Sequence, residues 1–225
     1  MEDLSILVKF PTRGRADKFF DVFSKYHSMA KNPLRLKFIV SCDQDDEEMV
    51  ACESRFGFYP NTKVVYGDSH TKIQAVNADI FKEDFDILLL ASDDMIPIVN
   101  GYDQVIRDKM KCYFPDLDGV LWFNDGFKYQ KLNTLSIMGK RYFDRFGYIY
   151  YPGYETMFAD AEFTEVAIKL KKIIYFDQVI IQHQHPDYGF CEIDDLYKKN
   201  GCKRRADMIL YEKRKKNNFD LEVET

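Results

Sequence analysis

The sequence lacks paired cysteines, a basic N-terminal leader and any apolar run of membrane length. Its five cysteines are odd in number and form no C-x-x-C pair, which argues against a disulfide framework and against a zinc site. The first residues, Met1 to Ser5, carry no positive charge, and no stretch approaches the roughly 20 apolar residues that span a bilayer. We therefore expect a soluble, cytoplasmic protein with reduced thiols, and leave open a peripheral contact with a membrane.

An excess of positive charge is also absent, since 32 Lys and Arg stand against 37 Asp and Glu, for a formal net charge of −5. This balance argues against a general binder of polyanions, although it does not describe local patches. The sequence contains neither a Walker loop nor a G-x-G-x-x-G motif, so the nucleotide-binding folds that depend on them are disfavoured. We find no internal repeat and no clear linker.

The chain does contain enough apolar material for one large domain, or for one domain with an appendage, in its 225 residues. Hydrophobic residues make up 46% and charged residues 31%, which is ordinary for a globular protein. The aromatic share of 16% is high and can supply both a core and stacking surfaces for sugars or bases.

Predicted strands and helices alternate in the first part of the chain. Short apolar runs predict strands, and apolar residues at helical spacing predict the helices between them. The expected strands are Ser5–Phe10, Leu36–Ser41, Lys63–Tyr66 and Ile87–Ala91, and the expected helices are Ala16–Ala30, one ending near Arg55, and Thr71–Phe81. This alternation predicts an α/β fold, with a mostly parallel sheet and helices on both faces.

The order is looser after residue 100. We expect helices at Gln104–Cys112 and Ala159–Lys171, strands at Gly119–Phe123 and Ile173–Ile181, an irregular aromatic segment at Tyr142–Tyr154, and a basic helical segment over 192–216. The sequence is accordingly divided into an α/β domain over 1–190 and a basic helical C-terminal extension over 191–225.

Two adjacent carboxylates, Asp93 and Asp94, directly follow the apolar strand Ile87–Ala91. The carboxyl ends of such strands are where open α/β sheets bind ligands. Adjacent carboxylates repel each other and favour a cation, although an acidic turn or a helix N-cap would give the same pattern. His183 and His185 follow the last expected strand and could complete a site for Mn²⁺ or Mg²⁺, or be surface histidines before a proline turn.

Three further positions could carry chemistry. The loop Thr12-Arg13-Gly14-Arg15 ends the first strand and offers donors for a phosphate or base, or its arginines are simply solvated. Asp160 shares the apolar side of its helix with Phe163, so it is a candidate general base or an N-terminal cap, whereas Glu162 points elsewhere as a solvent charge. Trp122, Asn124 and Asp125 could line a sugar or acceptor pocket, with a core Trp122 as the alternative.

Taken in order, these pieces resemble the GT-A glycosyltransferases of the family 2 type. The resemblance runs from about Ser5 to Pro186. It rests on Pro11-Thr12-Arg13-Gly14-Arg15, Asp43, Lys72-x-x-Ala75-x-Asn77, Ser92-Asp93-Asp94, Ser136–Gly139, Phe158–Phe163 and His183-x-His185-Pro186. It implies a GT-A fold over residues 1–190, with a Rossmann-like mixed sheet flanked by helices.

The resemblance also implies roles for individual residues. Thr12 and Asp43 would hold the nucleoside, with Arg13 and Arg15 in the same donor pocket. Lys72 would approach the base or phosphate, Asp93 the ribose or metal, and Asp94 the metal. Asp160 would be the base. The family commonly shows Glu-Asp where this chain has Ala159-Asp160, so Glu162 stays a second candidate for the base. Of the two histidines, His183 is the preferred metal ligand because it lies nearer the strand.

The implied activity is an inverting transfer of a sugar from a nucleoside-diphosphate sugar, with a UDP-sugar favoured, to an acceptor hydroxyl, using Mn²⁺ or Mg²⁺. A metal-dependent nucleotidyltransferase and a non-catalytic sugar-binding relic of the same fold are the alternatives. The basic C-terminal segment could contact an anionic surface, or it could be an ordinary solvated helix. The sequence does not identify the acceptor.

Overall fold

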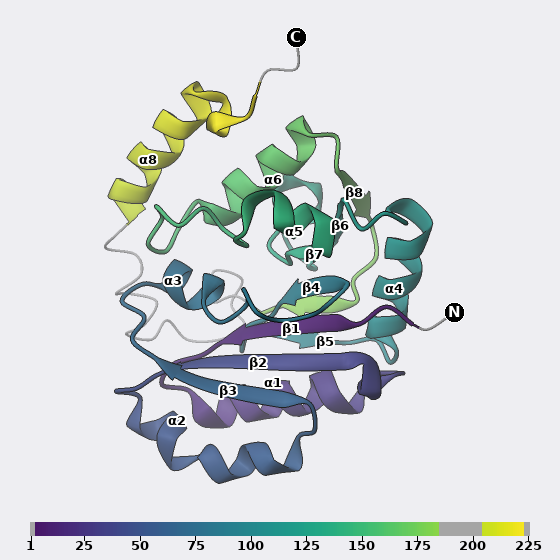
Figure 1. Cartoon of the computed structure of the whole chain (residues 1–225), viewed down its shortest axis with the longest axis vertical. Coiled ribbons are helices and arrows are strands. Elements are labelled where there is room, and N and C mark those ends of the chain that lie inside the picture. Colours follow the sequence, from purple (N-terminus) through teal and green to yellow (C-terminus); the bar gives the residue numbers. More distant parts are fainter. Residues whose placement is uncertain (1–2, 185–203, 223–225) are drawn as a thin grey trace.

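The computed structural model describes residues 3–184 and 204–222. Within these residues a seven-stranded sheet carries helices on both faces, and a two-stranded sheet lies beside it (Figure 1). The large sheet has the order β3-β2-β1-β4-β7-β6-β8. Its strands are β1 (Ile6–Pro11), β2 (Leu36–Asp43), β3 (Thr62–Gly67), β4 (Ile87–Leu90), β6 (Val120–Phe123), β7 (Ile137–Gly139) and β8 (Ile173–Phe176).

The first four strands are parallel neighbours, as the alternating pattern predicts. Strand β7 runs antiparallel to β4 and β6, while β6 and β8 are parallel. The predicted α/β fold with a mixed sheet is therefore confirmed. Because β1, β2, β3 and β4 run in the same direction, their carboxyl ends meet at one edge of the sheet.

The central strands are buried on both faces because apolar side chains occupy nearly every position. In β1, Ile6, Val8 and Phe10 face one side of the sheet and Leu7 faces the other. The first face is covered by α1 (Ala16–Ser28), α2 (Glu47–Ala51) and α4 (Tyr102–Tyr113), and the second by α3 (Lys72–Asn77), α5 (Lys140–Phe146) and α6 (Ala159–Lys169). Helix α8 (Arg204–Lys216) packs on α6 (Figure 1). Short 3₁₀ turns occupy Pro33–Arg35, Glu53–Phe58, Tyr129–Lys131 and Asn218–Asp220.

Much of the high aromatic content serves the core. Helix α1 buries Phe19 and Phe23 against Phe10 of β1, with ring centroids 4.8 and 5.9 Å away. Phe19 and Phe23 are themselves stacked at 5.0 Å. These contacts follow from aromatic residues at helical spacing facing an apolar strand.

The two-stranded sheet pairs β5 (Met95–Pro97) with β9 (Ile181–His183) in antiparallel fashion. The prediction of one strand over Ile173–Ile181 is wrong, because β8 belongs to the large sheet and β9 to the small one. Polar Asp177 divides them, and its carboxylate accepts hydrogen bonds from Asn124 Nδ2 at 2.8 Å and the Tyr175 hydroxyl at 3.1 Å. His183 therefore lies within a strand and not after one.

Two other predictions need correction. The aromatic segment Tyr142–Tyr154 is not irregular throughout, since it begins inside α5. That helix ends at Phe146 and is capped by Gly147, which adopts φ +71 while its N–H donates to the Phe143 carbonyl at 2.8 Å. Helix α3 stops at Asn77 and does not reach Phe81.

Strands β5 and β7 are only three residues long, which leaves too little pattern to predict them from sequence.

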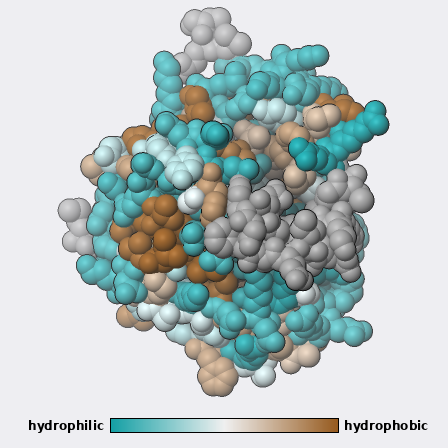
Figure 2. Space-filling model, turned by 180° about the vertical axis from the view of Figure 1, so that it is seen from behind, coloured by the Kyte–Doolittle hydropathy of each residue, from teal (hydrophilic) through white to brown (hydrophobic). Residues whose placement is uncertain are grey.

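The C-terminal basic helix is described only from Arg204 onward. The first part of the predicted segment 192–216 and the domain boundary between residues 190 and 191 lie outside the described residues. No helix in the described ranges is both long and apolar enough to cross a bilayer. Seen from behind, the surface is mostly hydrophilic, with hydrophobic side chains gathered in a few places (Figure 2).

Candidate active site

The loop after β1 meets the loop after β2 through an arginine and two aspartates. Arg13 Nη1 donates to Asp43, and the Arg13 guanidinium makes two bonds to Asp45 of 2.7 and 2.8 Å. The loop is fixed further by the Gly14 N–H, which donates to Asp46 at 2.7 Å. Because β1 and β2 are parallel partners that end together, Arg13 and Asp43 lie at the predicted edge of the sheet.

Thr12 lies between these two loops. Its N–H donates to the Ser41 carbonyl at 3.0 Å. Its Oγ1 atom is enclosed and has no hydrogen-bond partner among the described residues. A buried hydroxyl without a partner is costly, so this atom is a candidate for a contact that the described residues do not supply.

Asp93 contacts Arg15, the second arginine of the loop after β1. Arg15 Nη1 lies 3.2 Å from Asp93 Oδ1, and Lys18 Nζ lies 3.8 Å from the same oxygen. Burial raises the pKa of Asp93, and the opposite charges of Arg15 and Lys18 act against that rise. The structure thus joins Arg15 and Asp93, which lie far apart in the sequence.

Asp94 lies beside His183 because the two-stranded sheet pairs β5 with β9. Met95 is the register partner of His183, and the Gln184 N–H donates to the Asp94 carbonyl at 2.6 Å. In this register His183 Nε2 lies 3.5 Å from Asp94 Oδ2, and the Ser92 hydroxyl donates to Asp94 Oδ1. Burial alone would raise the pKa of Asp94, but the contacts to His183 and Ser92 and the charge of Lys72 lower it well below its usual range.

Asp125 supports His183 from the other side. Its carboxylate is 2% exposed and accepts from the Phe127 N–H at 2.8 Å, the Lys128 N–H at 2.7 Å and the Thr134 hydroxyl at 2.7 Å. His183 Nδ1 lies 3.9 Å from the same carboxylate. Asp125 therefore holds its own loop and faces His183. Trp122 is in the core, with its ring 5.4 Å from that of Tyr175.

Asp160 lies in the first turn of α6, and Lys72 is the first residue of α3. The Asp160 side chain is partly exposed, and its Oδ1 accepts from the Ala161 N–H at 2.9 Å. Burial among protein groups raises the pKa of Asp160, while the charges of Lys72 and His183 act against that rise. Lys72 and His183 also lie close enough to Asp94 to affect its pKa. Asp94, His183, Lys72 and Asp160 therefore lie in one region.

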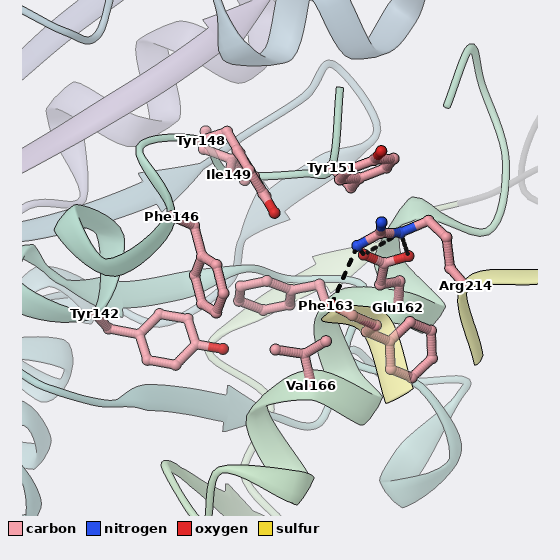
Figure 3. Close-up of a pocket in the computed structure, with 10 residues that line it drawn as sticks. Tyr142, Phe146, Tyr148, Ile149, Tyr151, Glu162, Phe163, Val166 and Arg214 are labelled. Atoms are coloured by element: carbon pink, nitrogen blue, oxygen red, sulfur yellow. Dashed lines mark hydrogen bonds and ion pairs between the residues drawn. The ribbon is translucent and has the colours of Figure 1, made fainter. Parts of the chain in front are cut away.

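Glu162 is elsewhere, and its predicted place among solvent-facing charges is wrong. It is 4% exposed and paired with Arg214 of α8, whose Nε donates to Glu162 Oε2 and whose Nη2 donates to Oε1, both at 2.8 Å (Figure 3). The Tyr154 hydroxyl donates to Glu162 Oε2 at 2.7 Å. A carboxylate occupied by an arginine and a tyrosine in an aromatic pocket is a structural element, so Asp160 is the better candidate for a base.

Of the predicted metal ligands, the described residues include only Asp94 and His183. Within residues 3–184 and 204–222 no group of three or more His, Cys, Asp or Glu side chains is placed to hold a metal ion. Asp94 and His183 are the two candidate ligands that the structure brings together, with Nε2 of His183 3.5 Å from Oδ2 of Asp94. His185 lies outside the described residues.

Two buried residues near Asp160, Asn133 and Tyr150, were not singled out from the sequence. Asn133 is fully buried, and neither polar atom of its side chain has a partner within the described part of the chain. Its N–H donates to the hydroxyl of Thr164, which donates to the Asp160 carbonyl at 2.7 Å. Tyr150 lies 3.0 Å from Ser136 Oγ, and burial, with the charge of Asp160, raises the Tyr150 pKa. No sequence signal distinguishes these residues from ordinary loop and core residues.

No family model and no curated protein matches the chain. Among solved structures, the mannosyltransferase PcManGT from Pyrobaculum calidifontis, in complex with GDP-Man and Mn²⁺, matches with a TM-score of 0.66 at 14% identity, over 84% of this chain and 59% of that one.

TarS from S. aureus, residues 1–349 in complex with UDP, matches with a TM-score of 0.65 at 12% identity, over 80% of this chain and 60% of that one. The same TarS segment in complex with UDP-GlcNAc matches with a TM-score of 0.62 at 11% identity, over 88% and 64%. These likenesses show a GT-A fold, as the sequence resemblance predicts. The chain spans about three fifths of the length of these structures.

Proposed function

We propose that the protein is a metal-dependent, inverting glycosyltransferase that moves a sugar from a nucleoside-diphosphate sugar to an acceptor hydroxyl. The observation that supports this best is the convergence of Asp94, His183, Lys72 and Asp160 at the ligand-binding edge of a GT-A fold. Such a transfer needs three parts: two side chains that bind a metal ion (Asp94 and His183), a positive side chain beside the phosphates (Lys72) and a carboxylate base (Asp160).

The nucleoside binds at the ends of β1 and β2. Asp43 accepts from a ring N–H of the base, which uracil and guanine both offer, and the unpartnered hydroxyl of Thr12 contacts the nucleoside beside it. Arg13 and Arg15 line the same pocket, and Asp93 reaches the ribose. A UDP-sugar is the favoured donor, and a GDP-sugar fits the same contacts. The similar structures with UDP, UDP-GlcNAc and GDP-Man support this range.

Asp94 and His183 would hold Mn²⁺ or Mg²⁺ beside the diphosphate. A carboxylate, an imidazole and phosphate oxygens are a suitable ligand set for such an ion. When bound, the cation neutralises the charge that develops on the departing nucleoside diphosphate. Lys72, whose charge acts on both Asp94 and Asp160, adds a further positive group on the same side.

Asp160 accepts the proton of the acceptor hydroxyl while that oxygen forms a bond to the anomeric carbon. The bond from this carbon to the diphosphate oxygen breaks in the same step, and the nucleoside diphosphate leaves with the electron pair. Attack opposite the leaving group inverts the configuration through an oxocarbenium-like transition state, and one base is sufficient because the enzyme forms no covalent intermediate.

A panel of UDP- and GDP-sugars tests this function, with and without Mn²⁺ and with water as the acceptor. We expect slow, Mn²⁺-dependent release of nucleoside diphosphate from at least one donor, and loss of that release in Asp94→Asn. Release of pyrophosphate would instead identify a nucleotidyltransferase. Binding of a nucleotide sugar without any turnover, either with water or after saccharides are added to the panel as acceptors, would favour a non-catalytic sugar-binding protein.

A further inference from the structure

Helix α8 is joined to the loop that precedes α6 by one buried carboxylate. Asp207 of α8 is 2% exposed. Its oxygens accept from three successive backbone N–H groups, those of Glu155 at 3.0 Å, Thr156 at 2.8 Å and Met157 at 2.8 Å. Three backbone donors converging on one ionised side chain are a strong restraint, because hydrogen bonds to a charged acceptor are stronger than neutral ones.

This loop leads into a strained residue. Phe158, the N-cap of α6, adopts φ +64, in the left-handed region that a bulky side chain rarely enters. Such a conformation persists only where neighbouring contacts impose it. Helix α8 supplies these contacts, because Asp207 holds the three residues before Phe158 and the ring of Tyr211 lies 5.5 Å from the Phe158 ring. The strained residue stands two positions before Asp160.

A second contact from α8 holds the first turn of α6 itself. Arg214 binds both carboxylate oxygens of Glu162, and its guanidinium carbon lies 3.4 Å from the centre of the Tyr151 ring (Figure 3). Arg214 also bonds Asp220 at 2.7 Å. Helix α8 therefore binds the chain on both sides of Asp160, at residues 155–157 and at Glu162.

The same loop contacts the helix that carries Lys72. The Ile73 N–H donates to the Glu155 carbonyl at 3.3 Å, and the Glu155 N–H is one of the three donors to Asp207. A displacement of the loop would thus reach the start of α3 as well as the start of α6.

We propose that Asp207 and Arg214 are positioning residues, and that α8 fixes the backbone turn that aims Asp160 at the acceptor. The inference rests on the proposed function insofar as Asp160 is the base. Neither side chain touches the reacting atoms. The effect of both is to keep residues 155–162 in one conformation, which a transfer reaction needs because small misplacements of a base are costly to the rate.

The test compares Asp207→Asn, which keeps the shape but removes the charge, with Glu212→Gln on the exposed side of the same helix as a control. Hydrogen exchange is measured on peptides covering 155–164. We expect about tenfold faster exchange in Asp207→Asn over this range, including the first turn of α6, with β1 and β4 unchanged. The control should match the wild-type protein. Faster exchange confined to residues 155–157 or to α8 would overturn the proposal.

Turnover and binding supply the second readout. With the donor found in the nucleotide-sugar panel, Asp207→Asn should lower kcat by about 10- to 100-fold and change the affinity for UDP with Mn²⁺ much less. A fall in nucleotide affinity equal to the fall in kcat would indicate general disruption and contradict positioning. If Asp207→Asn does not fold, Tyr211→Leu, which removes the ring against Phe158, is measured in the same way and must give the same split.

The two readouts separate this inference from the proposed function. If the wild-type protein turns over no nucleotide sugar, the proposed function fails, and the exchange measurement still decides whether α8 fixes residues 155–164. If the wild-type protein turns over a donor and Asp207→Asn retains full kcat, the proposed function stands and the positioning role is wrong.

Discussion

His183 Nε2 lies 3.5 Å from Asp94 Oδ2, and the pairing of β9 with β5 sets this distance. Met95 opposite His183 is the last register pair of that ladder, so Asp94 and His183 lie at its end. A slip of one residue would turn the imidazole to the other face of the strand, away from the carboxylate. The ladder is therefore what turns two distant polar residues into one candidate metal-binding pair.

The first prediction concerns this pair. Mn²⁺ together with UDP should raise the melting temperature of the wild-type protein, because a ligand that binds only the native state stabilises it by about 2.7 kcal/mol at 100 times its Kd. Asp94→Asn and His183→Ala should each lose most of the Mn²⁺-dependent part of that rise. Differential scanning fluorimetry with UDP alone, Mn²⁺ alone and both measures it.

His70→Ala is the control, because the His70 side chain is 73% exposed and contacts only Asp68 among the ion pairs of the described chain. It should show the full wild-type rise. Equal rises in His183→Ala and His70→Ala would mean that His183 is not a ligand.

The second prediction concerns Asp160. Asp160→Asn should lower kcat by about 10²- to 10⁴-fold, since it removes a general base, and should leave the affinity for UDP unchanged. Because burial raises the pKa of Asp160 and the base must be ionised, the wild-type rate should fall with decreasing pH at a higher pH than an ordinary aspartate would give. The pH profile of kcat measures this limb.

Asp21→Asn is a matched change on the exposed side of α1 and should alter neither kcat nor the profile. If Asp160→Asn kept the wild-type kcat, another group would have to be the base.

The third prediction concerns the buried pair Glu162–Arg214. Glu162→Gln removes the buried counter-charge of Arg214 and leaves only the exposed Asp220, so it should lower the free energy of unfolding by up to about 3–5 kcal/mol. Replacing both residues, as in Glu162→Leu with Arg214→Leu, should lower it less than Glu162→Gln alone. Urea unfolding of the three proteins gives the comparison. A double variant that is less stable than the single one would contradict the assignment of an uncompensated charge.

The positions of β1, β2, β3, β4 and β6 could be predicted because their apolar runs are short, continuous and separated by clear turns. Ile87–Ala91 was long enough to locate β4, and the position of Asp93 and Asp94 at its end followed from the sheet direction alone. The contacts of these two residues did not follow. Arg15 reaches Asp93 and His183 reaches Asp94 only through the tertiary pairing of segments far apart in the chain.

Glu162 shows a different limit of sequence patterns. Its place on the helical wheel put it away from Phe163 and so apparently in solvent, because α6 was treated as having one buried side. Helix α8 covers a second side and brings Arg214 to Glu162. Burial of that side depends on a distant helix, which the periodicity of α6 does not encode. The left-handed Phe158 likewise has no sequence signal, since glycine is the usual residue at such a position.

The fourth prediction concerns stability in acid and depends on His27. Its ring stacks on Phe38 at 4.1 Å and lies 4.9 Å from that of Tyr59, and its Nε2 has no hydrogen-bond partner among the described residues. Burial lowers the pKa of His27 to about 4, from an ordinary value of 6.5. Between these values the unfolded chain binds a proton that the native protein does not, so stability falls as the pH falls from 6.5 to 4.

His27→Phe should remove this dependence, because phenylalanine keeps the stacking and cannot be protonated. The free energy of unfolding of the variant, relative to the wild-type protein, should rise by up to about 3 kcal/mol between pH 6.5 and pH 4. Urea unfolding of both proteins at several pH values measures the difference. Parallel curves for wild-type and His27→Phe would mean that the native protein accepts the proton on His27 as readily as the unfolded chain does.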